Sequence, residues 1–381
     1  MKKIISFFLV IFLTFFTVNP VDADDIRLYA KSAILMEVET EEIMYGKSEK
    51  VFVQNASTTK IMTCIYILNH CNINDWAKVS SNAASQPRVR LGVHAGEKYR
   101  VKDMLYGMML ESFNDCAVVL AEYAAGSVEN FSKKINREAT KMGAKSTHFV
   151  TPNGLDASNA EGAHGTTAYD LAIIMSKCIK NQSFLNITRK ESYSFQDSSG
   201  KREFTCVNHN ALLRSMDGAI SGKTGYTSKA GYCYVGAVEK DGIKMIVVVL
   251  GSGWPPHKSY KWSDVKSLIN YGTSQYEYRN VKPDISKIRK IPVNHGTKKY
   301  VSVRLSEDEV KLFLRKKDKI EIRCKIIPSI DAPIKKGDVI GKIQYNKNKK
   351  CVHETMIISR ENIAGKDYWW YFGELLKDFM I

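Results

Sequence analysis

The chain has 381 residues, and its 56 Lys and Arg against 40 Asp and Glu give a formal net charge of +16. This length is enough for two or three domains with a sizeable core. No zinc-finger spacing, RNA-binding signature or basic heptad accompanies the positive charge, which argues against a nucleic-acid partner.

The first residues predict export. Met1-Lys2-Lys3 precedes an apolar run from Ile4 to Val18, and Val21-Asp22-Ala23 has small residues at both positions that a signal peptidase reads. The run is too short for a stable membrane span, so we expect residues 1–23 to be a signal peptide. Loss of Lys2, Lys3 and Asp22 leaves a mature charge of +15. An exported basic protein meets anionic lipid head groups and wall polymers.

Residues 24–280 predict a mixed α/β domain. Strands are expected at 30–37, 42–46, 219–226, 231–238 and 244–250, and helices at 55–68, 102–110, 115–125, 128–142, 167–180 and 260–276. Because strands lie at both ends of this stretch with helices between them, we expect one sheet that both ends close, with helices on its faces.

The character of the chain changes after Val281-Lys282-Pro283-Asp284, which resembles a linker. Short β runs follow at 300–305, 319–327, 338–345 and 352–358, separated by turn signals. We therefore expect residues 281–366 to form a small all-β domain.

The last segment, 367–381, is aromatic. On a helix, Trp369, Phe372, Leu376 and Phe379 fall on one side, and Glu374, Lys377 and Asp378 fall largely opposite. Fifteen helical residues span about 22 Å, less than the ~30 Å hydrocarbon core, so the segment is expected to lie in a membrane surface. The alternative is a helix docked on the β domain.

Eight cysteines occur, and none forms Cys-x-x-Cys, which argues against a zinc ribbon or a redox pair. Cys64 and Cys71 are seven residues apart on one predicted helix, too far for a bridge. Export allows disulfides, and the sequence leaves their pairing open.

A Ser-x-x-Lys pair, Ser57 and Lys60, begins the most apolar predicted helix, with Asn55 as the expected N-cap. Residues three apart share a helix face, so the Lys60 amine can reach the Ser57 hydroxyl. Serine is a poor nucleophile unless a base takes its proton, and lysine acts as that base only when it is neutral. The same pattern recurs at Ser198 and Ser263, so the pair needs partners elsewhere in the chain.

Two further motifs supply these partners. Ser112-Phe113-Asn114 lies between two predicted helices, and Lys223-Thr224-Gly225 lies on a predicted edge strand. Such a strand offers a cation, a hydroxyl and an open backbone edge, and its glycine leaves room for a substrate backbone.

In this order, the three motifs resemble the penicillin-recognising serine enzymes, specifically the D-alanyl-D-alanine carboxypeptidases among the low-molecular-mass penicillin-binding proteins. The resemblance runs from about Ala30 to Tyr276. It includes Arg90-Leu91-Gly92, Phe149-x-x-Pro152-Asn153-Gly154-Leu155 and His164-x-x-Thr167-Ala168-x-Asp170. It implies an antiparallel sheet flanked by helices, no cofactor or metal, and a location outside the cytoplasmic membrane of a bacterium.

The resemblance also implies roles for single residues. Ser57 would be acylated by the penultimate D-Ala of a peptidoglycan stem peptide, or by a β-lactam, with Lys60 as general base. Ser112 would relay a proton to the leaving amine, and Asn114 would bind the stem-peptide backbone. Lys223 and Thr224 would hold the terminal carboxylate, and Gly225 would leave the strand edge open for the substrate backbone. The N–H groups of Ser57 and Tyr226 would form the oxyanion hole.

Some residues depart from the family pattern. Phe113 stands where a small residue is usual and is expected to narrow the cleft. Lys258 is the candidate substitute for an arginine that many members carry. His164 is expected to be structural, because the motifs already supply a base.

Two other functions remain open at this stage. A serine β-lactamase shares the motifs, but no Glu-x-x-Leu-Asn string lies between Ser112 and Lys223. A non-catalytic wall-binding protein is supported only by Phe113 and the missing arginine.

Overall fold

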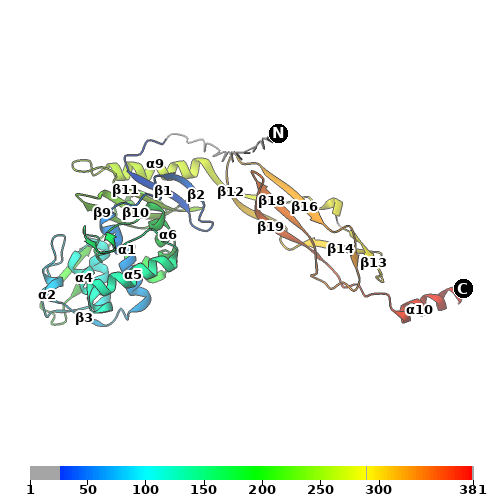
Figure 1. Cartoon of the computed structure of the whole chain (residues 1–381), viewed down its shortest axis with the longest axis horizontal. Coiled ribbons are helices and arrows are strands. Elements are labelled where there is room, and N and C mark those ends of the chain that lie inside the picture. Colours follow the sequence, from blue (N-terminus) through cyan, green and yellow to red (C-terminus); the bar gives the residue numbers. More distant parts are fainter. Residues whose placement is uncertain (1–25, 289, 380–381) are drawn as a thin grey trace, which may run out of the picture.

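The computed structural model describes residues 26–288 and 290–379, and the predicted signal peptide lies outside this range. It is elongated: a mixed α/β domain lies at one end, a β domain extends from it, and the C-terminal helix projects beyond the β domain (Figure 1).

The central sheet of the α/β domain has the order β2-β1-β11-β10-β9. Its strands are antiparallel, and Ser32 pairs with Leu250, so the two ends of the domain close one sheet as expected. β9, which carries Lys223-Thr224-Gly225, is an edge strand. The bounds are β1 (Ser32–Glu37), β2 (Ile43–Lys47), β9 (Ala219–Thr227), β10 (Gly231–Lys240) and β11 (Ile243–Leu250).

Helices cover both faces of this sheet. α9 packs on one face, and α6 packs on the other, beside α1, α4 and α5 (Figure 1). The bounds are α1 (Lys60–His70), α2 (Ser81–Ala84), α3 (Val101–Tyr106), α4 (Asn114–Ala125), α5 (Val128–Met142), α6 (Ala168–Cys178), α7 (Gln182–Thr188), α8 (Leu212–Ser215) and α9 (Tyr260–Gln275).

The burial of β1 follows from this double cover. All six of its residues are buried, although a strand alternates its side chains between two faces. Ile34 and Met36 belong to the core beneath α1, α4 and α6, whereas Ala33 and Leu35 belong to the core beneath α9. Both sets are apolar because neither face of the sheet meets water.

Three local features differ from the sequence expectation. The predicted helix 102–110 ends as α-helix at Tyr106 and continues as a π-helical turn, η2 (Gly107–Glu111). Short strands β3 (Trp76–Lys78) and β4 (Lys98–Arg100) pair near α2, which the sequence did not indicate. Small hairpins were also missed: β5 (Ser158–Asn159) with β6 (Gly162–Ala163), and β7 (Ser192–Gln196) with β8 (Glu203–Val207).

The β domain contains a six-stranded sheet of order β16-β18-β19-β14-β13-β17 and a core of its own. Its elements are η3 (Ser286–Ile288), β13 (Lys290–Asn294), β14 (Tyr300–Leu305), β15 (Val310–Arg315), β16 (Ile320–Ile326), β17 (Ile330–Asp331), β18 (Val339–Lys347) and β19 (Lys350–Ser359).

The strand that follows α9 belongs to the β domain by its pairing. β12 (Tyr276–Val281) pairs with β15 along its whole length, so the expected boundary at residue 280 falls inside a strand. Side chains from this part also bind the first hairpin: Tyr278 Oη donates to Glu37 Oε1 at 2.9 Å, and Lys347 Nζ donates to Glu42 Oε1 at 3.0 Å.

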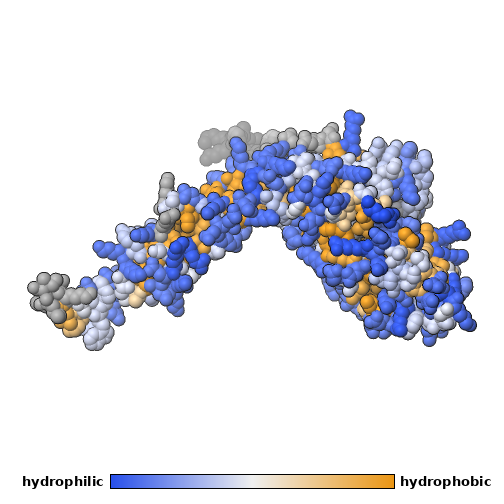
Figure 2. Space-filling model, turned by 180° about the vertical axis from the view of Figure 1, so that it is seen from behind, coloured by the Kyte–Doolittle hydropathy of each residue, from blue (hydrophilic) through white to orange (hydrophobic). Residues whose placement is uncertain are grey.

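The C-terminal segment forms α10 (Tyr368–Phe379). Four of its aromatic side chains are exposed, Tyr368 at 74%, Trp369 at 73%, Tyr371 at 52% and Phe372 at 45%, so they are not packed on the β domain. Figure 2 shows hydrophobic surface on this helix, at the far end of the molecule. Over the described range, no helix is long and apolar enough to cross a membrane.

Candidate active site

Ser57 lies on a 3-10 turn, η1 (Ala56–Thr59), directly before α1. A glycine of the 149–155 loop packs against this turn. A Cβ on Gly154, which has φ +84°, would lie 1.9 Å from the Ala56 carbonyl oxygen. Only glycine fits so close an approach with that backbone angle, so Gly154 fixes the loop against the serine.

Asn55 does not cap the helix as expected. Its side-chain amide donates to the hydroxyls of Thr58 and Thr59, both at 2.9 Å, and makes no hydrogen bond to a backbone N–H of the turn. The turn is held by side chains because it packs beneath other elements and is buried except at Ser57.

His164 contacts the same turn through Thr59. Its Nε2 is 2.9 Å from Thr59 Oγ1, and its Nδ1 accepts from the backbone N–H of Val150 at 3.0 Å. Nδ1 as acceptor requires a neutral ring with the proton on Nε2. Burial lowers the pKa of His164 to about 3, which keeps the ring neutral. These contacts give His164 a positioning role.

Lys60 is fully buried and lies against the serine. Its Nζ is 2.8 Å from Ser57 Oγ, 2.9 Å from Asn114 Oδ1 and 2.8 Å from the Asn153 carbonyl oxygen. Burial lowers the pKa of Lys60 well below its usual value, and the positive charge of Lys223 lowers it further. A neutral amine can accept the Ser57 proton while its own two hydrogens remain bonded to Asn114 and Asn153.

The π-helical turn presents Ser112. The residue ends η2 in the left-handed conformation, with φ +69°, and its Oγ accepts from Lys223 Nζ at 2.9 Å. Asn114 follows as the first residue of α4, so it lies on a helix end and not in the expected loop. Asp115 is buried and accepts backbone hydrogen bonds from Leu91, Gly92 and Val93, which ties the 91–93 loop to the start of α4.

The edge strand β9 forms the opposite wall. Lys223 is buried, and burial lowers its pKa to about 7. A Cβ on Gly225 would lie 3.0 Å from the Ser57 backbone nitrogen, so the strand passes directly beside the nucleophile. Thr224 is half-buried and Tyr226 is 43% exposed, at the rim of the cleft.

The structure thus brings the three motifs to one place. The Lys60 amine is hydrogen-bonded to Ser57 and Asn114, and Lys223 is hydrogen-bonded to Ser112. Sequence reasoning gave no role to Asn153, whose carbonyl accepts from Lys60. The one indication was its place in the Phe149–Leu155 string. Every residue has a backbone carbonyl, so the residue type does not reveal which carbonyl accepts a hydrogen bond.

Phe113 and Lys258, the two departures from the family pattern, have the following surroundings. The Phe113 ring is half-buried, packs on the main core and lies against Gly107, so it contributes to packing. Lys258 is exposed, and its carbonyl accepts from the buried Lys261 Nζ at 3.3 Å.

All eight cysteines are free thiols. Across residues 26–288 and 290–379, no group of three or more His, Cys, Asp and Glu side chains is arranged to hold a metal ion.

Known proteins share both domains of this chain. The family model for D-alanyl-D-alanine carboxypeptidase, peptidase family S11, matches residues 17–253, and that for the penicillin-binding protein 5 C-terminal domain matches residues 276–364. The D-alanyl-D-alanine carboxypeptidase DacF of Bacillus subtilis is 30% identical over 357 residues, which is 92% of this chain and 90% of DacF.

Solved structures agree. The D-alanyl-D-alanine carboxypeptidase DacD of Francisella tularensis is similar with a TM-score of 0.65 and 25% identity, covering 90% of this chain and 95% of DacD. Penicillin-binding protein 5 of Haemophilus influenzae has a similar fold, with a TM-score of 0.67 over 89% of this chain and 99% of that protein. The expected fold class and carboxypeptidase activity are confirmed, and the β-lactamase and non-catalytic alternatives are set aside. The chain belongs to the D-alanyl-D-alanine carboxypeptidases, the low-molecular-mass penicillin-binding serine peptidases.

Proposed function

We propose that this enzyme removes the terminal D-Ala from peptidoglycan stem pentapeptides through an acyl-enzyme on Ser57. The observation that supports this most is the buried Lys60 amine, 2.8 Å from Ser57 Oγ, with its pKa held low by burial and by Lys223. In its neutral form, an amine so placed can act as the general base for Ser57.

In the acylation step, Lys60 takes the Ser57 proton and Oγ attacks the penultimate D-Ala carbonyl. The backbone N–H groups of Ser57 and Tyr226 stabilise the developing oxyanion. The proton that Lys60 took is relayed through the Ser112 hydroxyl to the leaving amine, the C–N bond breaks, and D-Ala departs. Water then attacks the ester and releases the shortened peptide.

The charged end of the substrate is bound by β9. Lys223 and Thr224 hold the terminal carboxylate, and Gly225 leaves the strand edge open for the peptide backbone. Asn114 binds the stem peptide from the other side of the cleft. The same contacts recognise β-lactam antibiotics, which carry a carboxylate beside a reactive amide.

Mass spectrometry tests the assignment. The purified protein is treated with penicillin, digested, and searched for the modified peptide, and a separate sample is incubated with a pentapeptide ending in D-Ala-D-Ala. We expect one adduct, on Ser57, and release of one D-Ala. Ser57→Ala should remove both signals with a nearly unchanged thermal midpoint. An adduct on Ser112, Ser198 or Ser263 would contradict the proposal.

We further propose that the protein is exported and that α10 holds it on the outer face of the cytoplasmic membrane. Trp and Tyr favour the head-group region, and Tyr368, Trp369 and Leu375 are all exposed. The twelve residues of α10 are too few to span the bilayer, so the helix would lie along its surface.

Liposome flotation tests this anchoring. The mature protein is compared with a form that ends at Lys366, on vesicles with and without anionic lipid. We expect the full chain to float and the truncated form to remain below while keeping its penicillin labelling. Equal flotation of both forms, or aggregation of the truncated form, would favour docking of the helix on protein instead.

A further inference from the structure

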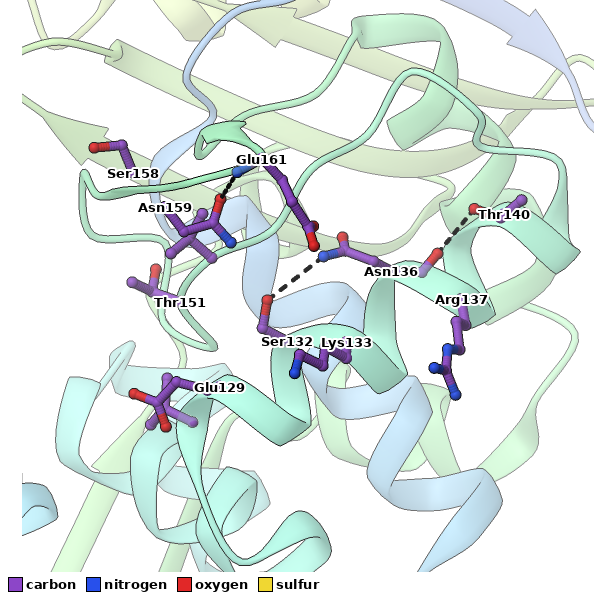
Figure 3. Close-up of a pocket in the computed structure, with 12 residues that line it drawn as sticks. Glu129, Ser132, Lys133, Asn136, Arg137, Thr140, Thr151, Ser158, Asn159 and Glu161 are labelled. Atoms are coloured by element: carbon purple, nitrogen blue, oxygen red, sulfur yellow. Dashed lines mark hydrogen bonds between the residues drawn. The ribbon is translucent and has the colours of Figure 1, made fainter.

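A polar groove lies beside α5, apart from the catalytic cleft. It is bounded by α5, the β5–β6 hairpin and residues 150–151 (Figure 3), with a volume of about 920 Å³. None of the motif residues lines it. This volume is in the range of small-molecule sites, and all but two of the lining residues are polar.

Four charged side chains line this groove without partners. Glu129, Lys133 and Arg137 follow one another at four-residue spacing on α5, and Glu161 lies on the hairpin opposite. Figure 3 shows Glu161 extending toward the α5 side. Although Glu129 and Lys133 are spaced for an ion pair, none of the four side chains makes an ion pair or hydrogen bond to any part of the chain that the structure describes.

The floor of the groove is fixed. Asn136 Oδ1 accepts from the Phe149 N–H at 2.8 Å, and its Nδ2 donates to the Phe149 carbonyl at 2.9 Å. Ser132 Oγ donates to the same carbonyl. These polar groups are satisfied within the protein, whereas the four charged side chains above them are exposed to solvent and accessible to a ligand.

From this arrangement, we propose that the groove binds a peptide with both a free carboxylate and a free ammonium, as a second stem peptide of the wall polymer has. Lys133 and Arg137, one helical turn apart, take the carboxylate, and a guanidinium can do so with two parallel hydrogen bonds. Glu161, which extends toward α5, takes the ammonium, and Glu129, at the other end of the groove, is a second acidic position (Figure 3). The groove contains no aromatic ring on which a sugar could stack, which disfavours the glycan strand as the ligand.

The groove adjoins the catalytic loop. Thr151 lines it, and Thr151 Oγ1 accepts from the Gly154 N–H at 3.2 Å and donates to the Leu155 carbonyl at 3.0 Å. Asn153, which gives Lys60 its carbonyl acceptor, lies inside this turn. A peptide in the groove would therefore rest against the loop that helps to position the base. The inference rests on the proposed stem-peptide substrate.

A binding measurement on penicillin-acylated protein tests the site, because acylation blocks the catalytic cleft. The probe is the tetrapeptide L-Ala–D-Glu–L-Lys–D-Ala, which lacks the D-Ala-D-Ala end, followed by calorimetry. We expect binding that the paired variant Lys133→Gln/Arg137→Gln weakens at least about tenfold. The matched control Lys141→Gln/Lys145→Gln removes the same charge outside the groove and should bind as the parent does.

Three results would overturn the proposal: no binding to the acylated protein at millimolar peptide, equal binding by both paired variants, or binding of an N-acetylglucosamine tetramer in place of the peptide. Circular dichroism confirms that each variant is folded. Loss of penicillin labelling in the parent protein would instead count against the proposed reaction, and peptide binding can then be measured on Ser57→Ala protein.

Discussion

The two domains differ in what they bury. In its described part, the α/β domain buries nine Asp, Glu and Lys side chains: Glu37, Lys60, Asp103, Asp115, Asp170, Asp197, Lys223, Lys261 and Asp264. In the described part of the β domain, the buried polar side chains are Asn346, Thr355 and Ser359, with no Asp, Glu, Lys or Arg among them. Burial of a charged group costs several kcal/mol unless the group is well hydrogen-bonded. Buried charged groups therefore indicate a domain in which they take part in catalysis or hold loops in place.

Several buried carboxylates of the α/β domain hold backbone segments together. Asp264 accepts from the N–H groups of Tyr29 and Ala30, and Asp115 accepts from three N–H groups of the 91–93 loop. The β domain places its charges in surface pairs, either exposed, such as Arg323 with Glu321, or half-buried, such as Lys342 with Glu354. Such pairs contribute little to stability. The β domain therefore depends on its apolar core, and the α/β domain depends on its core and on bonded charges.

The largest effect is expected at the catalytic lysine. Lys60→Gln should lower the rate of acylation by penicillin at least about a thousandfold, because it removes the base. The thermal midpoint should change by only a few degrees, since the amide keeps part of the hydrogen bonding. Stopped-flow labelling and calorimetry measure the two quantities. Lys342→Gln in the β domain is the control and should leave acylation unchanged.

A second comparison concerns the buried carboxylate Asp115. Asp115→Ala leaves four backbone N–H groups, those of Leu91, Gly92, Val93 and Cys116, without their acceptor. It should lower the free energy of unfolding by about 2–5 kcal/mol. Urea denaturation followed by fluorescence gives the value. Glu321→Ala, which removes the exposed pair with Arg323 in the β domain, should not move the denaturation midpoint. A similar loss in both variants would contradict the distinction between the domains.

The third expectation concerns pH. The charge of Lys223 lowers the pKa of Lys60, so Lys223→Gln should raise that pKa and move the acid limb of the acylation profile to higher pH. Peptide binding should weaken about 10- to 100-fold through loss of the carboxylate contact. The pKa of Lys223 is about 7, so the parent should lose peptide affinity as pH rises above 7, and the variant should not.

The measurement is kcat/KM for a pentapeptide, together with penicillin acylation, from pH 5 to pH 10. The acid limb in the acylation profile reports Lys60, and the fall of peptide affinity at high pH reports Lys223. An acid limb at the same pH in both proteins would refute the coupling between the two lysines.

The smallest effect is expected at Phe113. Because its ring packs on the core and against Gly107, Phe113→Ala should lower the free energy of unfolding by about 1–2 kcal/mol. Acylation should change by less than about threefold. A large gain in acylation rate would show instead that the ring narrows the cleft, as the sequence alone suggested.

The sequence predicted those parts of the molecule that depend on neighbours along the chain. The hairpin of β10 and β11, the buried helix α1 and the strand carrying Lys223 all follow from local periodicity and turn residues. Their joining into one sheet followed from their order in the chain.

What the sequence could not show depends on contacts between distant segments. The π-helical turn before Ser112 and the 3-10 turn at Ser57 are determined by packing. The apolar spacing of the sequence there predicts an ordinary α-helix in both places. The Asn153 carbonyl reaches Lys60 across 93 positions in the chain. The sequence assigned no element to residues 277–280, which form most of β12, because their strand character depends on pairing with β15.

The pairing of β1 with β11 has a consequence for the making of this enzyme. The sheet cannot close before Leu250 has been synthesised, because Leu250 is the partner of Ser32. The contacts of the site also span long distances in the chain: 96 residues from Ser57 to Asn153 and 111 from Ser112 to Lys223. Such non-local contacts form late and slowly in folding. A growing chain therefore contains Ser57 long before that serine can react. The reactive site forms only when nearly the whole α/β domain has been synthesised.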